Sequence, residues 1–142
     1  MSVTHEVFRL AYASRSLLPE ATVAEEMVRL LEHARRNNAA AGITGALLFT
    51  EDAFVQVLEG TMEAVEVTFE RIQCDPRHAE VVVLEAAVAP ARDFAGWSIA
   101  YAGRQTGPHF DALAARTHAA PMDALVLLHG ALGRLSGCRV PA

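Results

Sequence analysis

The order in which two hydrophobic periodicities follow one another constrains this chain's fold more than any other feature. Five segments have the alternation or the β-branched content of strands, and two have the 3.6-residue period of amphipathic helices. Their order, β-α-β-β-α-β-β, is typical of a sheet with both helices on one face, the ferredoxin-like arrangement of the α+β class. The predicted strands are residues 7–13, 43–50, 53–59, 80–88 and 97–101.

The two predicted helices have recognisable starts and stops. Thr22 and Glu25 have the spacing of a capping box, and we expect the first helix to end at residues 36–38, before Gly42. Thr61 can cap the second helix, which Pro76 ends. The apolar stripes are Val23, Met27, Leu30, Leu31 and Ala34 in the first helix and Val65, Phe69 and Ile72 in the second.

The sequence divides into residues 1–103, predicted as the domain, and residues 104–142, predicted as a C-terminal extension of two helices on the other sheet face. That face needs a cover, because Val55 and Val57 point away from the predicted helices and are apolar. The tail or a partner subunit would provide it, so we expect a homodimer or higher homo-oligomer. The tail helices are marked by Phe110, Leu113 and Ala114, and by Leu125, Leu128, Leu132 and Leu135.

Composition excludes several classes of protein. A formal net charge of -5 argues against nucleic acid as a direct partner. The two cysteines form no CxxC pair, the N-terminus has no apolar signal core, and no apolar run approaches the ~20 residues of a membrane helix. We therefore expect a cytoplasmic protein with no membrane contact. His78 has no second ligand at metal-binding spacing, and phosphate-loop, dinucleotide-binding and hydrolase motifs are missing.

One glutamine does not fit a plain core. Gln56 lies in an apolar strand, on the side of Phe54 and Leu58, and leaving a buried amide unpaired costs about 1–3 kcal/mol. Tyr12 is the natural partner by the same parity argument, since the two strands are neighbours in a ferredoxin-like sheet. This pair is either a hydrogen bond within an ordinary core or part of a functional site.

Two further polar pairs have both a structural and a functional interpretation. Asn37 and Asn38 stand at the predicted end of the first helix, where one asparagine would be a good C-terminal cap and the other could point elsewhere. Arg71 and Asp75 stand one helical turn apart and could form an exposed i,i+4 ion pair.

Five segments together resemble the BLUF family, blue-light sensors that use FAD. They follow the family's order and spacing across about residues 7 to 103, and the family's fold is the ferredoxin-like sheet predicted above. The resemblance implies a photoreceptor rather than an enzyme, with FAD, FMN or riboflavin as its cofactor. The matching segments are RLAYAS at 9–14, RNNAAAGITGALL at 36–48, FVQVLEG at 54–60, RIQCDPRH at 71–78 and RDFAGW at 92–97.

The resemblance also implies how a flavin would lie between the two helices. Leu30 and Ile72 would pack on its ring, and Asn38 would bond its carbonyl and imide edge. Arg71 and Asp75 would lie at the far edge of the ring, with His78 nearer the ribityl-phosphate arm.

The implied photochemistry uses the pair already identified. Tyr12 would supply an electron and then a proton, and Gln56 would rotate or tautomerise and so exchange the hydrogen bonds that the flavin receives. Trp97 and Ile99 would relay the signal. Ile99 stands where many members of the family have a methionine, and its stiff β-branched side chain puts that route in question.

Three functions follow as hypotheses. The first is a photoreceptor whose output reaches a separate protein or changes self-association. The second, motivated by Ile99, is a light-insensitive flavin-binding or small-ligand-binding module. The third is an acylphosphatase-like enzyme on the same fold, but residues 14–19 contain no glycine for the phosphate cradle which that chemistry needs.

Overall fold

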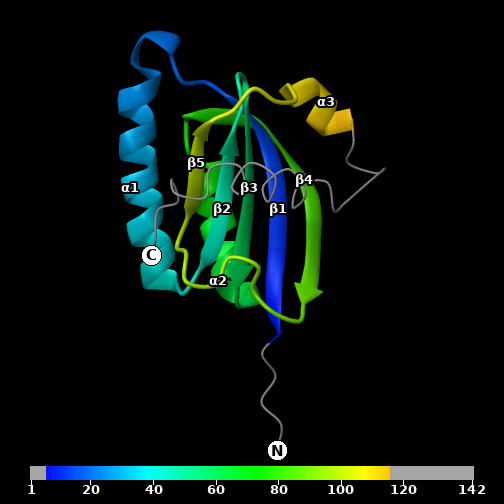
Figure 1. The fold of residues 1–142 in the computed structure, drawn as a ribbon. Coiled ribbons are helices and arrows are strands. Elements are labelled where there is room, and N and C mark those ends of the chain that lie inside the picture. Colours follow the sequence, from blue (N-terminus) through cyan, green and yellow to red (C-terminus); the bar gives the residue numbers. More distant parts are fainter. Residues whose placement is uncertain (1–5, 116–142) are drawn as a thin grey trace, which may run out of the picture.

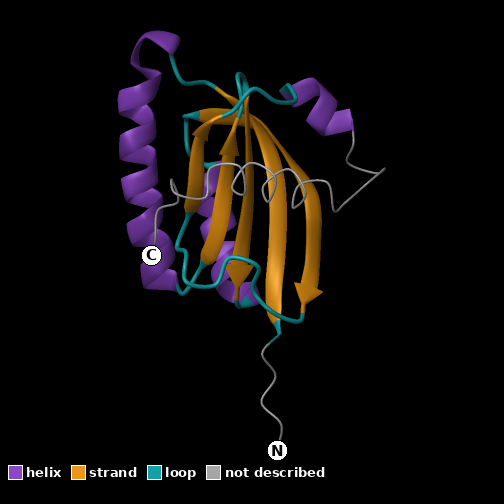
Figure 2. Ribbon diagram, viewed as in Figure 1, coloured by secondary structure: helices purple, strands orange, loops and turns teal. Residues whose placement is uncertain are grey.

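A computed structural model of the chain describes residues 6–115. The described part is a five-stranded sheet with helices, coloured by chain position in Figure 1 and by secondary structure in Figure 2. The main elements are β1 (Val7–Ser16), α1 (Val23–Ala41), β2 (Thr44–Phe49), β3 (Ala53–Gly60), α2 (Met62–Gln73), β4 (His78–Ala89), β5 (Ala100–Arg104) and α3 (Phe110–Ala115), with a short 3-10 helix at Glu20–Thr22.

The strand order is β4-β1-β3-β2-β5. Neighbouring strands run antiparallel except β2 and β5, which run parallel. α1 and α2 lie against the same face of this sheet (Figure 1). The predicted ferredoxin-like α+β fold is confirmed, and it brings the two helices side by side over the central strands.

The register of the central strands places one polar pair directly. Tyr12 on β1 stands opposite Gln56 on β3, and Leu47 on β2 stands on the other side of Gln56. Gly45 allows β2 and β3 to approach closely, because a Cβ at that position would lie 1.9 Å from the carbonyl oxygen of Val57. Strand pairing therefore fixes where Gln56 can point.

The first helix differs from its prediction at both ends. Thr22 makes no side-chain cap hydrogen bond, so the predicted capping box does not form. The helix also continues past residues 36–38 to Ala41, and Gly42, at φ 71, ends it in the left-handed conformation that glycine adopts at no steric cost. Asn37 and Asn38 are thus helical residues rather than caps.

The second helix begins as predicted, but the last strand does not. The Thr61 hydroxyl accepts a hydrogen bond from the Ala64 amide at 3.1 Å. The strand predicted at 97–101 starts only at Ala100, because the Trp97 amide is used in a turn, donating to the carbonyl of Phe94 at 3.0 Å. Gly96 completes this turn at φ 85.

The two faces of the sheet carry separate clusters of buried side chains. The helix-facing side packs the predicted stripes of both helices, including Met27 on α1 and Val65 on α2, against the strands. The other side has a cluster that includes Val55 and Val57, to which α3 contributes Phe110 and Leu113, as predicted for the first tail helix. The second predicted tail helix lies outside the described residues.

Residues 6–115 contain neither a membrane-spanning helix nor a cluster of metal-ligating side chains. No helix there is both long and apolar enough to cross a membrane. In the same part of the chain, no group of three or more His, Cys, Asp and Glu side chains could hold a metal ion.

Candidate functional site

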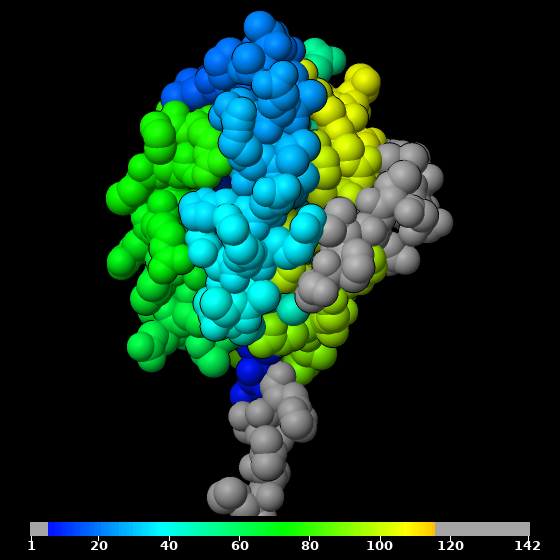
Figure 3. Space-filling model, turned by 90° about the vertical axis from the view of Figure 1, so that its left-hand side faces the viewer, coloured from blue at the N-terminus to red at the C-terminus, as the bar shows by residue number. Residues whose placement is uncertain are grey.

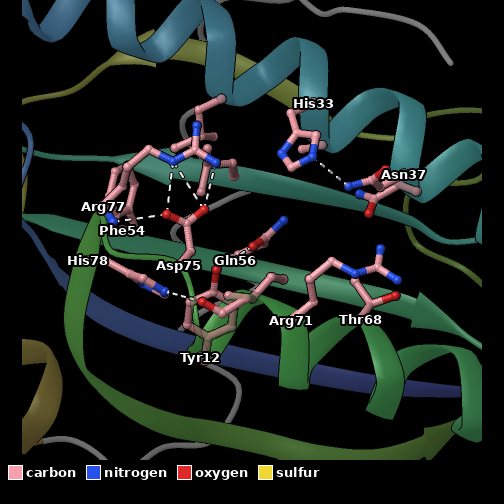
Figure 4. A pocket seen from close by; sticks show the side chains of 15 residues that line it. Tyr12, His33, Asn37, Phe54, Gln56, Thr68, Arg71, Asp75, Arg77 and His78 are labelled. Atoms are coloured by element: carbon pink, nitrogen blue, oxygen red, sulfur yellow. Dashed lines mark hydrogen bonds and ion pairs between the residues drawn. The ribbon is translucent and has the colours of Figure 1, made fainter.

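A cavity lies between α1 and α2, with the central strands as its floor. Figure 3 looks onto α1, with the green residues of α2 beside it, and Figure 4 shows the side chains that line the cavity. All eight residues predicted to contact a cofactor are among them. The lining consists of Tyr12, Leu30, His33, Ala34, Asn37, Asn38, Leu47, Phe54, Gln56, Thr68, Arg71, Ile72, Asp75, Arg77 and His78.

Tyr12 and Gln56 form the buried polar pair of the floor. The Tyr12 hydroxyl donates to Gln56 Oε1, as strand parity predicted, and the two residues are 3% and 6% exposed. Gln56 Nε2 has no hydrogen-bond partner among residues 6–115. The Gln56 side chain lies in the space between the two helices (Figure 4), so this amide presents an unused donor to the cavity.

The surroundings of Tyr12 keep its phenol protonated. Burial raises the pKa of Tyr12 far above its ordinary value, and the negative charge of Asp75 raises that pKa further. The ring also packs near Phe69, at 5.5 Å between centroids. A neutral phenol that donates its proton to Gln56 is therefore the stable form.

Asn38 on α1 offers the cavity an acceptor. Its Nδ2 donates to the carbonyl of Ser98 at 2.8 Å, and because a carbonyl only accepts, this contact fixes which end of the amide is nitrogen. Asn38 Oδ1 has no partner in the described part of the chain. The neighbouring Asn37 also lines the cavity, but its amide is already paired, with the exposed His33 at 3.2 Å.

Of the two interpretations of Arg71 and Asp75, the exposed i,i+4 ion pair does not form. Asp75 lies beyond the end of α2 and accepts instead from the Arg77 backbone amide at 2.9 Å and from the Arg77 guanidinium at 2.6 Å. Partial burial alone would raise the pKa of Asp75, but the hydrogen bonds from Arg77 outweigh it and hold that pKa below its ordinary value. Arg71 lines the cavity from α2, opposite His33 (Figure 4).

His78 joins a strand to a helix end. Its Nδ1 lies 2.6 Å from the Ser14 hydroxyl, and its Nε2 lies 2.6 Å from the carbonyl of Ile72. The carbonyl requires a proton on Nε2, so in the neutral ring Nδ1 accepts from Ser14. Both ring nitrogens are occupied, and His78 therefore holds the end of α2 against β1 while its ring lines the cavity.

The residues present fit a flavin. The isoalloxazine ring is flat, with apolar faces and one edge of carbonyl and imide groups. Leu30 on α1 and Ile72 on α2 offer apolar walls, while Gln56 Nε2 and Asn38 Oδ1 offer one unused donor and one unused acceptor. One donor and one acceptor match the carbonyl and imide edge of the ring, which both accepts and donates hydrogen bonds.

The two predicted relay residues do not line this cavity. Ile99 is 1% exposed and packs on the helix-facing side with Leu47 and Phe54. Trp97 packs on the opposite side, against the cluster that contains Phe94. The two side chains, two residues apart, thus lie on opposite faces of the sheet.

Sequence reasoning missed several lining residues, of which Arg77 has the largest chemical consequence. The sequence interpretation considered only Arg71 as an ionic partner of Asp75, although the Asp-Pro-Arg sequence is a good turn former and could have pointed to a contact two residues on. His33 and Thr68 gave no signal, because polar residues at helical spacing are usually solvated.

Comparison with known proteins identifies a family. Residues 7–100 match the family described as "BLUF: Sensors of blue-light using FAD". Among curated proteins, the photoactivated adenylate cyclase subunit alpha of Euglena gracilis is 36% identical over 63% of this chain. The blue light- and temperature-regulated antirepressor BluF of Escherichia coli (strain K12) is 44% identical over 49% of it. The chain spans only 9% and 17% of the length of these two relatives.

Solved structures that resemble this chain include BLUF proteins as well. The dark-state structure of BlrB, described as a BLUF protein, superposes with a TM-score of 0.69 at 29% identity, covering 93% of this chain and 98% of BlrB. The ground state of BlsA superposes with a TM-score of 0.66 at 34% identity, covering 70% of this chain and 66% of BlsA.

Proposed function

Because the chain belongs to the BLUF family of blue-light sensors, we propose that it is a flavin-binding photoreceptor in which Tyr12 and Gln56 are the photoactive pair. The single observation that carries this proposal is the Gln56 amide. One end of it accepts from Tyr12, and the other faces the cavity with no partner in the described part of the chain. A bistable hydrogen-bond switch needs this arrangement.

FAD is the cofactor we propose, with FMN and riboflavin as alternatives that fill the same ring site. Leu30 and Ile72 would pack on the ring faces, and Asn38 Oδ1 would accept from its imide edge. Arg71 and the Arg77-bound Asp75 would lie at the rim, and His78 would hold the end of α2 in place. The support is the chemistry of the lining, which joins apolar walls to one unused donor and one unused acceptor.

The photochemical step uses the polar pair of the cavity floor. A bound flavin would supply the absorption of blue light and, once excited, an acceptor strong enough to oxidise a phenol. Tyr12 would give up an electron and pass its hydroxyl proton toward Gln56 Oε1, to which it already donates. Rotation or tautomerisation of the amide would then exchange the donor and acceptor that Gln56 presents to the cavity. The electron and proton would then return to Tyr12 and leave only the rearranged amide, which would relax thermally in the dark, so the cycle would consume no substrate.

We propose that the output leaves through protein contacts rather than catalysis. Residues 1–103 would form the sensing domain and residues 104–142 its helical extension. The signal would pass along Trp97 and Ile99 to a separate effector or to a second copy of this chain. Support comes from their placement, because these two residues pack on opposite faces of the sheet and connect the cavity side to the far side.

An absorption spectrum before and after blue light tests the function. We expect purified, flavin-loaded protein to show a reversible red shift, because changed hydrogen bonding at the ring alters its excitation energy. Tyr12→Phe should keep the flavin and lose the shift, since only the hydroxyl is removed. A Tyr12→Phe variant that shifts fully would contradict the role assigned to Tyr12.

A light-insensitive flavin-binding module is the second candidate, and Ile99 favours it. This side chain is 1% exposed and β-branched, so it resists the rearrangement that a flexible methionine would allow. The second candidate predicts bound flavin with no lasting spectral change in the wild type. In that case Ile99→Met should restore a shift if stiffness is the cause.

A further inference from the structure

A second buried polar side chain on β3 takes no part in the cavity. Glu59 is 0% exposed and stands three residues after Gln56, which places it on the opposite face of the sheet. A buried carboxylate is costly unless its oxygens are hydrogen-bonded, so its partners indicate its purpose.

All three side-chain contacts of Glu59 are donors, and two come from one loop. The backbone amides of Asp93 and Phe94, in the connection between β4 and β5, donate to its two oxygens at 2.6 and 3.1 Å. The Thr44 hydroxyl donates at 2.9 Å. Arg92 in the same loop donates to the backbone carbonyls of Gly42 and Glu59, at 3.0 and 3.2 Å. The loop is therefore bound to the end of β3 and to the end of α1.

The anchored loop leads directly to the proposed relay residues. The carbonyl of Phe94 accepts from the Trp97 amide at 3.0 Å, and the Trp97 carbonyl accepts from the Gly45 amide at 3.1 Å. The next carbonyl, that of Ser98, accepts from Asn38 at 2.8 Å. Residues 93–98 are thus held by Glu59 at one end and by β2 and Asn38 at the other.

We propose that Glu59 is a positioning residue that keeps Trp97 on the far face of the sheet and the Ser98 carbonyl within reach of Asn38. It acts through the loop, not on the flavin. Without it the segment before β5 would move more freely, and the light-adapted hydrogen bonds would return to the dark state sooner. The kinetic part of this inference rests on the proposed photoreceptor function, whereas the positional part does not.

The position of Trp97 can be measured directly, because it is the single tryptophan of the chain. Glu59→Gln keeps the shape of the side chain but replaces one of the two accepting oxygens with an NH₂ group, so at least one of the three donors loses its acceptor. We expect the acrylamide quenching constant of Trp97 fluorescence, measured on flavin-loaded protein in the dark, to rise at least about threefold. Glu80→Gln is the control, since Glu80 is a carboxylate that bonds Arg15 and no residue of this loop. Equal quenching in Glu59→Gln and the wild type would overturn the proposal.

The kinetic readout separates this inference from the proposed function. Dark recovery of the red-shifted spectrum should be several-fold faster in Glu59→Gln than in the wild type or Glu80→Gln. If no protein shifts under blue light, the photoreceptor proposal fails, while the quenching result still decides the role of Glu59. Thr44→Val removes one donor to Glu59 and one acceptor of Arg92, at 2.9 Å each, and is the milder variant if Glu59→Gln does not fold. The quenching constant of Trp97 should also rise in Thr44→Val, and an unchanged constant in that variant would contradict the positioning role of Glu59.

Discussion

Two polar side chains on one strand show how burial can serve opposite purposes. Gln56 and Glu59 on β3 are 6% and 0% exposed, yet they differ in how their polar atoms are used. The Gln56 amide bonds Tyr12 at one end and offers the other to the cavity, whereas both oxygens of Glu59 accept from fixed donors. A group with an unused end can change partners, and a group with none can only hold its neighbours in place.

Removing the carboxylate of Glu59, the anchor of the loop at residues 93–98, should have the largest effect on stability. Glu59→Leu would leave the Asp93 and Phe94 amides and the Thr44 hydroxyl without their acceptor. We expect the free energy of unfolding to fall by at least about 3 kcal/mol, from three donors at about 1 kcal/mol or more each. Urea denaturation of flavin-loaded protein measures this. Glu51→Leu, at an exposed site, is the control, and a loss of less than about 1 kcal/mol in Glu59→Leu would contradict the account.

Removing the amide of Gln56, the proposed switch, should lower the free energy of unfolding less than removing the Glu59 anchor. Gln56→Leu deprives the Tyr12 hydroxyl of its acceptor, and we expect a loss of about 1–2 kcal/mol in the same urea experiment. The added apolar side chain recovers part of that loss, because it lies in a largely apolar surrounding. If Gln56→Leu proved more destabilising than Glu59→Leu, the contrast between the two side chains would be reversed.

The contribution of Asn38 to flavin affinity can be measured against that of its neighbour Asn37. Asn38→Ala removes both the bond to Ser98 and the acceptor facing the cavity, so we expect flavin to bind about tenfold more weakly, or about 1.4 kcal/mol. Asn37→Ala should change affinity less than about twofold, since its amide pairs with the exposed His33. Fluorescence titration with FAD compares the two, and equal effects would argue against a specific contact from Asn38.

A smaller effect concerns alkaline pH. Burial raises the pKa of Tyr12, so the folded protein keeps a phenol proton that the unfolded chain loses above about pH 10. The unfolded state then binds fewer protons, and stability falls as pH rises beyond that value. Denaturation midpoints between pH 9 and pH 11, values set by the ordinary tyrosine pKa of about 10, should fall less steeply in Tyr12→Phe. Parallel slopes in the two proteins would contradict the shifted pKa.

The floor of the cavity could be predicted from sequence because strand alternation has a fixed period of two. That period placed Tyr12 and Gln56 on one face, and the fold made their strands neighbours. The end of α1 was less predictable, because both asparagine and glycine are common at helix C-termini. The helix ends at Gly42 and not at the asparagines. Asn38 remained helical, and its amide found the Ser98 carbonyl, which lies 60 residues away in sequence.

Glu59 and Arg77 show what local pattern does not contain. Glu59 lies near the end of an apolar strand, where a solvated carboxylate is expected, and two of its three donors come from a loop 34 and 35 residues further on. Asp75 bonds Arg77 rather than Arg71, because α2 ends at Gln73 and the chain no longer keeps Asp75 one helical turn after Arg71. Both outcomes depend on tertiary placement rather than on hydrophobic period.

Light-minus-dark difference spectra of three flavin-loaded proteins test the division between switch and anchor most directly. The wild type and Glu59→Gln should both show the red shift at equal amplitude, with faster decay in Glu59→Gln, because the anchor does not touch the hydrogen bond that changes. Gln56→Leu should bind flavin and show no shift. A full red shift in Gln56→Leu would contradict the assignment of Gln56 as the switch.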